Sequence, residues 1–147
     1  MIAYKRVPDE IYSPRWLIEG VLAHAQRPGY PVDRPSLEKI EEWSNAILRM
    51  GIKSVLCILD FTQLDHYDRL NMQGGSLFGY YRSQGLNVEH VCAEDHKIPS
   101  LTVEEQEAAL AAFHRLEKPV LIHCSAGKDR TGSAITYILA KMPVNVG

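Results

Sequence analysis

The sequence predicts a single α/β domain built on buried parallel strands, and three observations support this prediction. Its 147 residues are about the modal size of one domain. No internal repeat, low-complexity tract or charge block divides residues 1–147. Short, nearly all-apolar runs, typical of strands buried on both faces, follow segments in which apolar residues recur at helical spacing.

The first third of the chain predicts short strands, a helix and a buried strand. Pro and Gly residues surround the apolar stretch Trp16–Ala25, which indicates short strands joined by turns up to about Pro35. Apolar side chains recur at helical spacing through Ser36–Met50, and Gly51 follows as a helix terminator. The run Ile52–Leu59 is short and apolar, and therefore predicts a strand buried on both faces.

The remaining elements continue the α/β pattern. Residues Asp65–Gln84 predict a helix with a break at the glycine pair 74–75, and Leu86–Cys92 predict a strand. The segment Thr102–Glu105 is a capping box that opens a further helix. Its expected buried stripe is Ala109, Leu110, Phe113 and Leu116. A strand over Pro119–His123 and a helix over Thr131–Lys141 complete the chain.

Composition excludes several classes of function. With 16 Lys and Arg against 18 Asp and Glu, the net charge of -2 indicates no general attraction to nucleic acid or to an anionic membrane. The first residues lack the apolar core of a secretion signal, and no apolar run approaches the length of a membrane span. A cytoplasmic protein without membrane insertion is therefore expected. Neither the cysteines nor the histidines have metal-ligand spacing, so we expect no metal and no cofactor.

The segment HCSAGKDRTG, residues 123–132, lies between a predicted buried strand and the start of a predicted helix. Unpaired amides and the helix dipole favour an anion at that place. Gly127 allows a tight turn in which successive amides point inward around a phosphate. The residues expected to bind phosphate are Ser125, Ala126, Gly127, Lys128, Asp129 and Arg130.

Two side chains in this segment indicate chemistry. Arg130, six positions after Cys124, is expected to return across the mouth of the loop and offer a planar fork to two phosphoryl oxygens. The same amides and dipole favour the thiolate form of Cys124. A thiolate beneath a phosphorus atom is a nucleophile in position for in-line attack.

This segment resembles the signature of the protein tyrosine phosphatase superfamily, which is His-Cys, five residues, then Arg and Ser or Thr. The matching residues are His123, Cys124, Gly127, Arg130 and Thr131. The small size and the late position of the signature resemble the dual-specificity branch. The resemblance implies a parallel-rich sheet flanked by helices and catalysis through a phosphocysteine intermediate. It also implies that Thr131 hydrogen-bonds the departing sulfur and that His123 orients the loop.

The resemblance also implies a general acid some thirty residues before the cysteine. Asp95 lies 29 positions before Cys124, just past a predicted strand, with Pro99 shortly downstream. Glu94 is its rival, and in a third interpretation both carboxylates merely solvate a loop. A positioned carboxylic acid typically contributes about 10²- to 10⁴-fold to such a reaction.

The sequence does not decide between a phosphoprotein and a phospholipid substrate. We expect phosphotyrosine first, with phosphoserine and phosphothreonine as further protein substrates. Phosphoinositides or inositol phosphates are the alternative substrate class. Lys128 resembles the loop lysine of some phosphoinositide phosphatases, but position 125 is Ser, and Asp129 adds a negative charge beside the site. A phosphate-recognition module without catalysis is the alternative from another class.

Two further expectations concern the other cysteines and the end of the chain. Cys57 and Cys92 are predicted to be small buried side chains, and the alternative for either is a reversible disulfide with Cys124. After the signature helix the sequence has the short tail 142–147, where relatives usually continue with further helices. This shortened C-terminal helical part predicts a poorly covered sheet face. A minimal domain, a truncated chain or a homodimer that buries the exposed apolar surface would each explain it.

Overall fold

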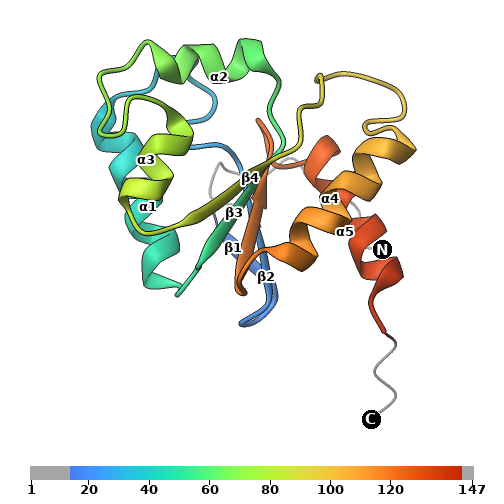
Figure 1. The fold of residues 1–147 in the computed structure, drawn as a ribbon. Coiled ribbons are helices and arrows are strands. Elements are labelled where there is room, and N and C mark those ends of the chain that lie inside the picture. The colour runs from blue at the N-terminus through green and yellow to red at the C-terminus, as the bar shows by residue number, and fades with distance from the viewer. Residues whose placement is uncertain (1–13, 144–147) are drawn as a thin grey trace.

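The computed structural model describes residues 14–143 and contains a five-stranded sheet between helices (Figure 1). The strands are β1 (Arg15–Ile18), β2 (Leu22–Ala25), β3 (Ser54–Cys57), β4 (Asn87–His90) and β5 (Val120–His123). The helices are α1 (Leu37–Arg49), α2 (Phe61–Asp68), α3 (Leu77–Ser83), α4 (Val103–Arg115) and α5 (Asp129–Lys141). The α/β fold with a parallel-rich sheet flanked by helices is confirmed.

The strand order is β1-β2-β5-β3-β4, with β5 at the centre. The β1–β2 pair is antiparallel, and the β2–β5, β5–β3 and β3–β4 pairs are parallel. The carboxyl ends of four strands therefore meet at one edge of the sheet, which is where open α/β sheets place their ligands. The chain that follows β5 at this edge is the predicted phosphate loop.

Helices cover both faces of the sheet, and the central strands are apolar on both sides for that reason. In Figure 1, α1 and α3 lie on one face, and α4 and α5 lie on the other. Val55 and Cys57 pack into the core on the α1 side, whereas Leu56 and Ile58 pack into the core on the α4 side. The described residues thus fill both layers, and the poorly covered face that suggested a homodimer is not found.

Most predicted elements form close to their predicted bounds. Ser36 caps α1 by accepting from the amide of Lys39. Thr102 caps α4 through the predicted capping box. The stripe of α4 packs inward as expected, although Leu110 is half-buried where Ala109 and Phe113 are buried.

Two predicted helix starts were wrong, whereas the predicted break at the glycine pair is present. The segment Asp65–Gln84 is interrupted where expected, and Gly74 and Gly75 lie in the break with positive φ of 89° and 80°. Its first part, α2, begins earlier than predicted, at Phe61, because Asp60 and the residue three positions later form a second capping box. The last helix begins at Asp129 rather than at Thr131, so that Arg130 belongs to its first turn and not to the loop.

Cys92 was also predicted wrongly. Strand β4 ends at His90, and Cys92 is exposed in the segment that follows it. The apolar pattern of Leu86–Cys92 alternates as in a strand, but β4 ends at His90; the Val91 amide still donates to the Cys57 carbonyl at 3.0 Å, and Cys92 lies beyond it. Cys57, by contrast, is buried as predicted.

Candidate active site

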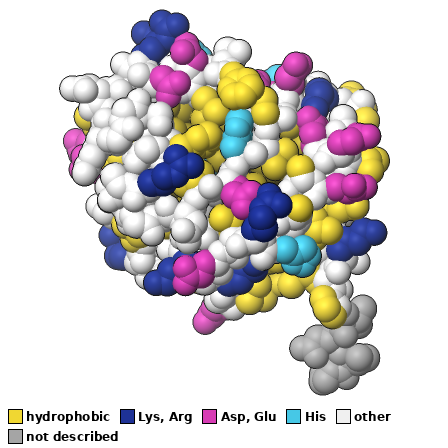
Figure 2. All heavy atoms as spheres, in the orientation of Figure 1, with side chains coloured by type: hydrophobic (Ala, Val, Ile, Leu, Met, Phe, Trp, Pro, Cys, Tyr) yellow, Lys and Arg dark blue, Asp and Glu magenta, His cyan; other side chains and the backbone are white. Residues whose placement is uncertain are grey.

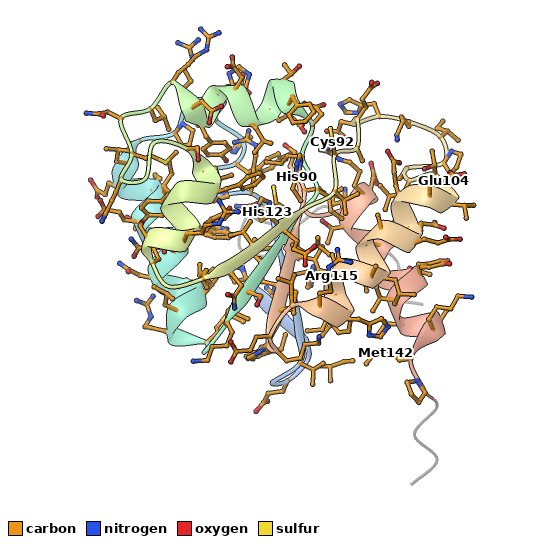
Figure 3. All side chains as sticks on the ribbon, in the orientation of Figure 1. His90, Cys92, Glu104, Arg115, His123 and Met142 are labelled. Carbon is orange, nitrogen blue, oxygen red and sulfur yellow. The ribbon has the colours of Figure 1, made fainter. Side chains whose placement is uncertain are left out.

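The predicted catalytic residues converge at the carboxyl edge of the sheet. Cys124 directly follows β5, Asp60 follows β3 and caps α2, and Asp95 lies in the segment between β4 and α4. Figure 3 shows His123 on the α1 and α3 side of the sheet and Cys92 beyond the end of β4. Strand topology therefore brings Asp60, Asp95 and Cys124, which are 29 to 64 positions apart, into one site.

The loop between β5 and α5 is seated against the end of β2, and Gly127 makes this possible. Gly127 has φ of 75°, a conformation that side chains disfavour. A Cβ atom added there would lie 2.6 Å from the carbonyl oxygen of Ala25, closer than any real contact. The backbone amide of Arg27 donates to the carbonyl of Ser125 at 2.9 Å. The predicted tight turn at Gly127 is present, and the close approach to β2 is a second reason for glycine.

Arg27 supports the loop from below and was not predicted. Its buried guanidinium donates from Nε to Ser125 Oγ at 3.1 Å. Its Nη1 donates to the Val32 carbonyl at 2.8 Å and to the Tyr67 hydroxyl at 3.2 Å. The Tyr67 hydroxyl in turn donates to the Pro28 carbonyl. An arginine with this many fixed partners holds the loop in one position.

His123 is fixed by two hydrogen bonds that assign its tautomer. Its Nδ1 lies 3.0 Å from the Cys124 carbonyl, which can only accept, so Nδ1 carries the proton. Its Nε2 lies 2.8 Å from the Tyr81 hydroxyl and accepts from it. Burial raises the pKa of Tyr81, so this hydroxyl keeps its proton. Burial lowers the pKa of His123 to about 4, and the ring is neutral at pH 7.

This neutral histidine predicts a loss of stability in mild acid. His123 has a pKa of about 4 in the fold and 6.5 in the unfolded chain. Between these values the unfolded chain binds the proton and the folded chain does not, so the free energy of unfolding falls as pH falls. We expect His123 to contribute a loss of about 2 kcal/mol between pH 7 and pH 5. Urea unfolding at both pH values measures it.

The matched comparison is His123→Gln, which replaces the ring by an amide that can still donate and accept hydrogen bonds but does not titrate. Burial also lowers the pKa of His24, which therefore adds to the slope in the same direction in both proteins. The His123 contribution is the difference between the two slopes. Equal slopes in the wild type and in His123→Gln would contradict the prediction.

Cys124 and Thr131 lie at the base of the site. Cys124 is 2% exposed, and Thr131, in the first turn of α5, is fully buried. The Thr131 hydroxyl has no hydrogen-bond partner within the described part of the chain. Cys57 is paired with His123 in the sheet register and lies beneath the loop. Burial raises the pKa of the Cys57 thiol, so that thiol is protonated beside Cys124.

Arg130 is the best-defined side chain of the site. It is 1% exposed, and its Nη1 donates to the Ala93 carbonyl at 2.8 Å and to Gln63 Oε1 at 2.8 Å. Its Nη2 lies 3.0 Å from Asp95 Oδ2, which is an ion-pair distance without hydrogen-bond geometry. Its Nε has no hydrogen-bond partner among residues 14–143. One edge of the guanidinium is thus anchored to protein, while the edge formed by Nε and Nη2 retains its donor capacity.

The two acid candidates occupy different positions. Asp95 is half-buried, is paired with Arg130 and accepts from the amide of His96 through Oδ1 at 2.9 Å. Glu94 is exposed. A groove beside the site is lined by residues of α2 and of the segment after β4, namely Asp60, Phe61, Thr62, Gln63, Cys92, Glu94, Asp95 and His96. Asp95 is therefore the carboxylate that the fold brings to the arginine.

The other predicted phosphate-binding residues follow the same loop. Ser125 is held by Arg27, and Lys128 and Asp129 form the start of α5. Lys128 and Asp129 also line a groove between α4 and α5 that includes Gln106, Ser133 and Tyr137. Figure 2 shows Lys, Arg, Asp and Glu side chains interspersed on the visible face rather than gathered by sign.

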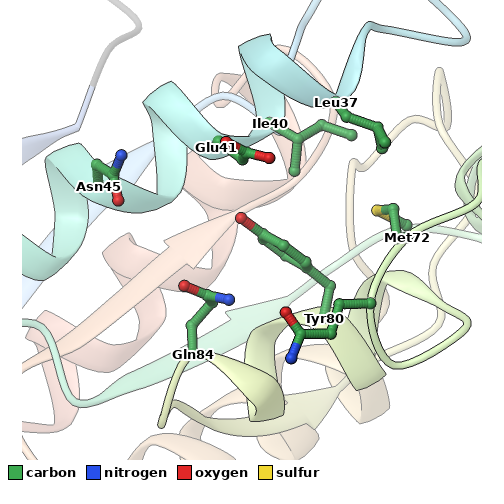
Figure 4. A pocket seen from close by; sticks show the side chains of 8 residues that line it. Leu37, Ile40, Glu41, Asn45, Met72, Tyr80 and Gln84 are labelled. Carbon is green, nitrogen blue, oxygen red and sulfur yellow. The ribbon is translucent and has the colours of Figure 1, made fainter.

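A separate pocket lies between α1 and α3 and contains none of the predicted site residues (Figure 4). Its lining includes Leu37, Ile40, Glu41, Met72 and Tyr80. Among residues 14–143 there is no group of three or more His, Cys, Asp and Glu side chains placed to hold a metal ion. No helix in the same range is both long and apolar enough to cross a bilayer.

Comparisons with known proteins agree with this geometry. Residues 59–145 match the family described as "Tyrosine phosphatase family". Two structures of Tk-PTP, a glycine-to-alanine mutant and the active form, are similar in fold with TM-scores of 0.60 and 0.59. They are 17% and 20% identical, and the matches cover 90% of this chain and 74% and 76% of theirs.

A third similar structure is kinase associated phosphatase with its catalytic-site cysteine replaced by serine. It has a TM-score of 0.56 and 15% identity, and the match covers 83% of this chain and 68% of that one. A comparison with curated protein sequences gives no match.

Proposed function

The chain belongs to the tyrosine phosphatase family, and from this premise we propose that it hydrolyses phosphomonoesters, with phosphotyrosine as the leading substrate class. The observation that carries the proposal is the state of Arg130. Its Nη1 is anchored to Ala93 and Gln63, whereas Nε has no hydrogen-bond partner among residues 14–143 and Nη2 is ion-paired with Asp95 without hydrogen-bond geometry. Two parallel N–H groups with this geometry are a bidentate site for a phosphoryl group.

Binding would place the phosphoryl group between three sets of donors. In this proposal the backbone amides of residues 125–130 donate to it from the loop, and the N-terminus of α5, which begins at Asp129, adds its dipole. Arg130 closes the site from above. The entering phosphoryl oxygens compete with Asp95 for Nη2, which weakens the Arg130–Asp95 ion pair.

In the first chemical step the Cys124 thiolate attacks phosphorus, and a sulfur–phosphorus bond forms as the bond to the tyrosyl oxygen breaks. Asp95 gives its proton to that oxygen, so the product leaves as the neutral phenol. Arg130 and the loop amides stabilise the charge on the equatorial oxygens in the transition state.

In the second step water attacks the phosphocysteine, and the Asp95 carboxylate takes a proton from this water. The sulfur–phosphorus bond breaks and Cys124 leaves as a thiolate. The buried Thr131 hydroxyl, which has no other partner in the described part of the chain, is the donor we assign to this sulfur. His123, neutral and fixed by Tyr81, holds the Cys124 carbonyl and thereby the start of the loop.

The rim of the site supports an aryl phosphate as the substrate. Phe61 is 70% exposed and lines the same groove as Asp95, so that an aromatic leaving group would meet an apolar side chain beside the acid. Asp60, Glu94 and Asp129 add negative charge around the loop, which disfavours substrates with several phosphates.

A substrate panel tests the proposal. We expect kcat/KM for a phosphotyrosine peptide to exceed that for a matched phosphoserine peptide by at least about tenfold, because phenoxide is the better leaving group and meets Phe61. Phosphoinositide vesicles form the third arm. A higher kcat/KM for phosphoinositides would overturn the substrate assignment. Binding of phosphopeptide without release of phosphate would favour the non-catalytic module.

A further inference from the structure

Gln63 lies between the two side chains on which the proposed reaction depends. It is half-buried in the first turn of α2, 67 residues before Arg130 and 32 before Asp95 in sequence. Its Oε1 accepts from Arg130 Nη1 at 2.8 Å, and its Nε2 donates to Asp95 Oδ2 at 3.4 Å. One amide therefore contacts the guanidinium through its oxygen and the carboxylate through its nitrogen.

The orientation of this amide follows from its partners. Oε1 also receives the backbone amide of Asp60 at 3.3 Å, so two donors converge on the oxygen. A rotated amide would direct its NH₂ group at both donors and its oxygen at the Asp95 carboxylate, which only accepts. The observed orientation is the one that satisfies all three contacts.

Gln63 is itself held in place by the helix start. Its backbone amide donates to Asp60 Oδ1 at 2.8 Å, which completes the capping box of α2. Asp60 lies between the end of β3 and the start of α2, at the carboxyl edge of the sheet. The side chain is thus fixed to a rigid element, whereas Asp95 lies in a segment without regular structure.

We propose that Gln63 is a positioning residue that docks the acid-bearing segment onto the phosphate-binding arginine. This inference rests on the proposed function. An amide serves here because it offers an acceptor to one neighbour and a donor to the other. A carboxylate would retain the contacts to Arg130 and Asp60 but would repel Asp95, and an apolar side chain would lose all of these contacts.

Two variants separate these contacts. Gln63→Leu removes the whole bridge between Arg130 and Asp95, that is, both its Arg130 arm (the contact from Nη1 to Oε1) and its Asp95 arm (the contact from Nε2 to Oδ2). Gln63→Glu keeps the cap and the Arg130 contact and changes only the Asp95 contact. The exposed Asp68, at the other end of α2 and outside the groove that Asp95 lines, provides the control Asp68→Asn, which alters the same helix without reaching either partner. Each protein is assayed with para-nitrophenyl phosphate, a good leaving group, and with phenyl phosphate, a poor one.

For Gln63→Leu we expect kcat with phenyl phosphate to fall about tenfold further than kcat with para-nitrophenyl phosphate, because the good leaving group needs little help from the acid. We also expect inorganic phosphate to bind several-fold more weakly, because Arg130 loses an anchor. The phosphate measurement, by thermal shift, tests the Arg130 arm without turnover. Asp68→Asn should behave as the wild type in both measurements.

For Gln63→Glu we expect the basic limb of the pH–rate profile to move to higher pH by about half a unit or more, because a second carboxylate beside Asp95 favours its protonated form. The other charged or titratable groups at Asp95 are Arg130 at 3.0 Å, His96 at 3.8 Å, and Asp60, Glu94 and Cys92 in the shared groove. These groups are the same in wild type and variant.

A merely structural role makes different predictions. If Gln63 acts only in the capping box, Gln63→Leu will lower the melting temperature, keep the ratio of the two kcat values and bind phosphate as the wild type does. Either an unchanged ratio or an unchanged phosphate affinity would overturn the bridge. A wild type that hydrolyses neither compound but binds phosphate through Gln63 would contradict the proposed function and leave the Arg130 arm supported.

Discussion

Cys124→Ser is expected to lower kcat with para-nitrophenyl phosphate by at least about 10⁴-fold. A serine hydroxyl at this position stays protonated at neutral pH, because its ionisation is far less favourable than that of a thiol, and the proposed reaction uses no other nucleophile. The side chain is 2% exposed, so the exchange of sulfur for oxygen leaves the packing nearly unchanged. Initial rates of release of nitrophenolate measure the effect.

The binding function should survive in the same variant. Arg130 and the loop amides do not depend on the sulfur, so we expect Cys124→Ser to bind a phosphotyrosine peptide with an affinity close to the Michaelis constant of the wild type. Cys92→Ser is the matched control, since Cys92 is exposed and lies outside the loop. Retention of more than about one hundredth of the wild-type kcat in Cys124→Ser would contradict the assignment of the nucleophile.

The strand, the tight turn and the helix around the signature were predictable from sequence because they depend on contiguous residues. His123, Cys124, Gly127 and Arg130 lie within eight positions, between a strand and a helix whose patterns are both clear. Local geometry then determines which way amides and dipole point. The structure adds a second requirement at Gly127, the approach of β2, which no pattern within the loop reveals.

The side chains that support the loop were not predictable in this way. Arg27 reaches Ser125 across 98 positions, and Tyr81 reaches His123 across 42. Such contacts depend on strand order, which places β2 beside β5, and a single sequence does not state that order. The partial signal was the aromatic and basic character of these positions, which surface or core packing explains equally well.

The two errors in helix starts have different causes. In the segment after β3, the capping box at Asp60 begins a helix four residues earlier than periodicity suggested. At the signature, Asp129 and Arg130 were treated as loop because their side chains have chemistry, yet the backbone there is already helical. Consequently Arg130 points from a rigid turn, which favours the pre-organised clamp that phosphate binding needs.

Asp95→Asn is the second change with a large expected effect. An amide cannot give a proton to the leaving oxygen, so kcat with phenyl phosphate should fall by about 10²- to 10³-fold. With para-nitrophenyl phosphate the fall should be much smaller, since nitrophenolate leaves without a proton. Asparagine also keeps the size of the side chain and an oxygen that can face Arg130, so the fold of the segment is retained.

The pH dependence of kcat tests whether Asp95 acts as the general acid. A general acid works only while it carries its proton, so wild-type kcat with phenyl phosphate should decline as pH rises through the titration of Asp95. Asp95→Asn should lack this basic limb. Glu94→Gln is the matched control, because it removes a neighbouring carboxylate that is exposed, and it should keep both the rate and the limb. A basic limb that persists in Asp95→Asn and disappears in Glu94→Gln would transfer the role to Glu94. The Arg130–Asp95 pair favours loss of the basic limb in Asp95→Asn, because the acid must lie beside the group that holds the phosphate.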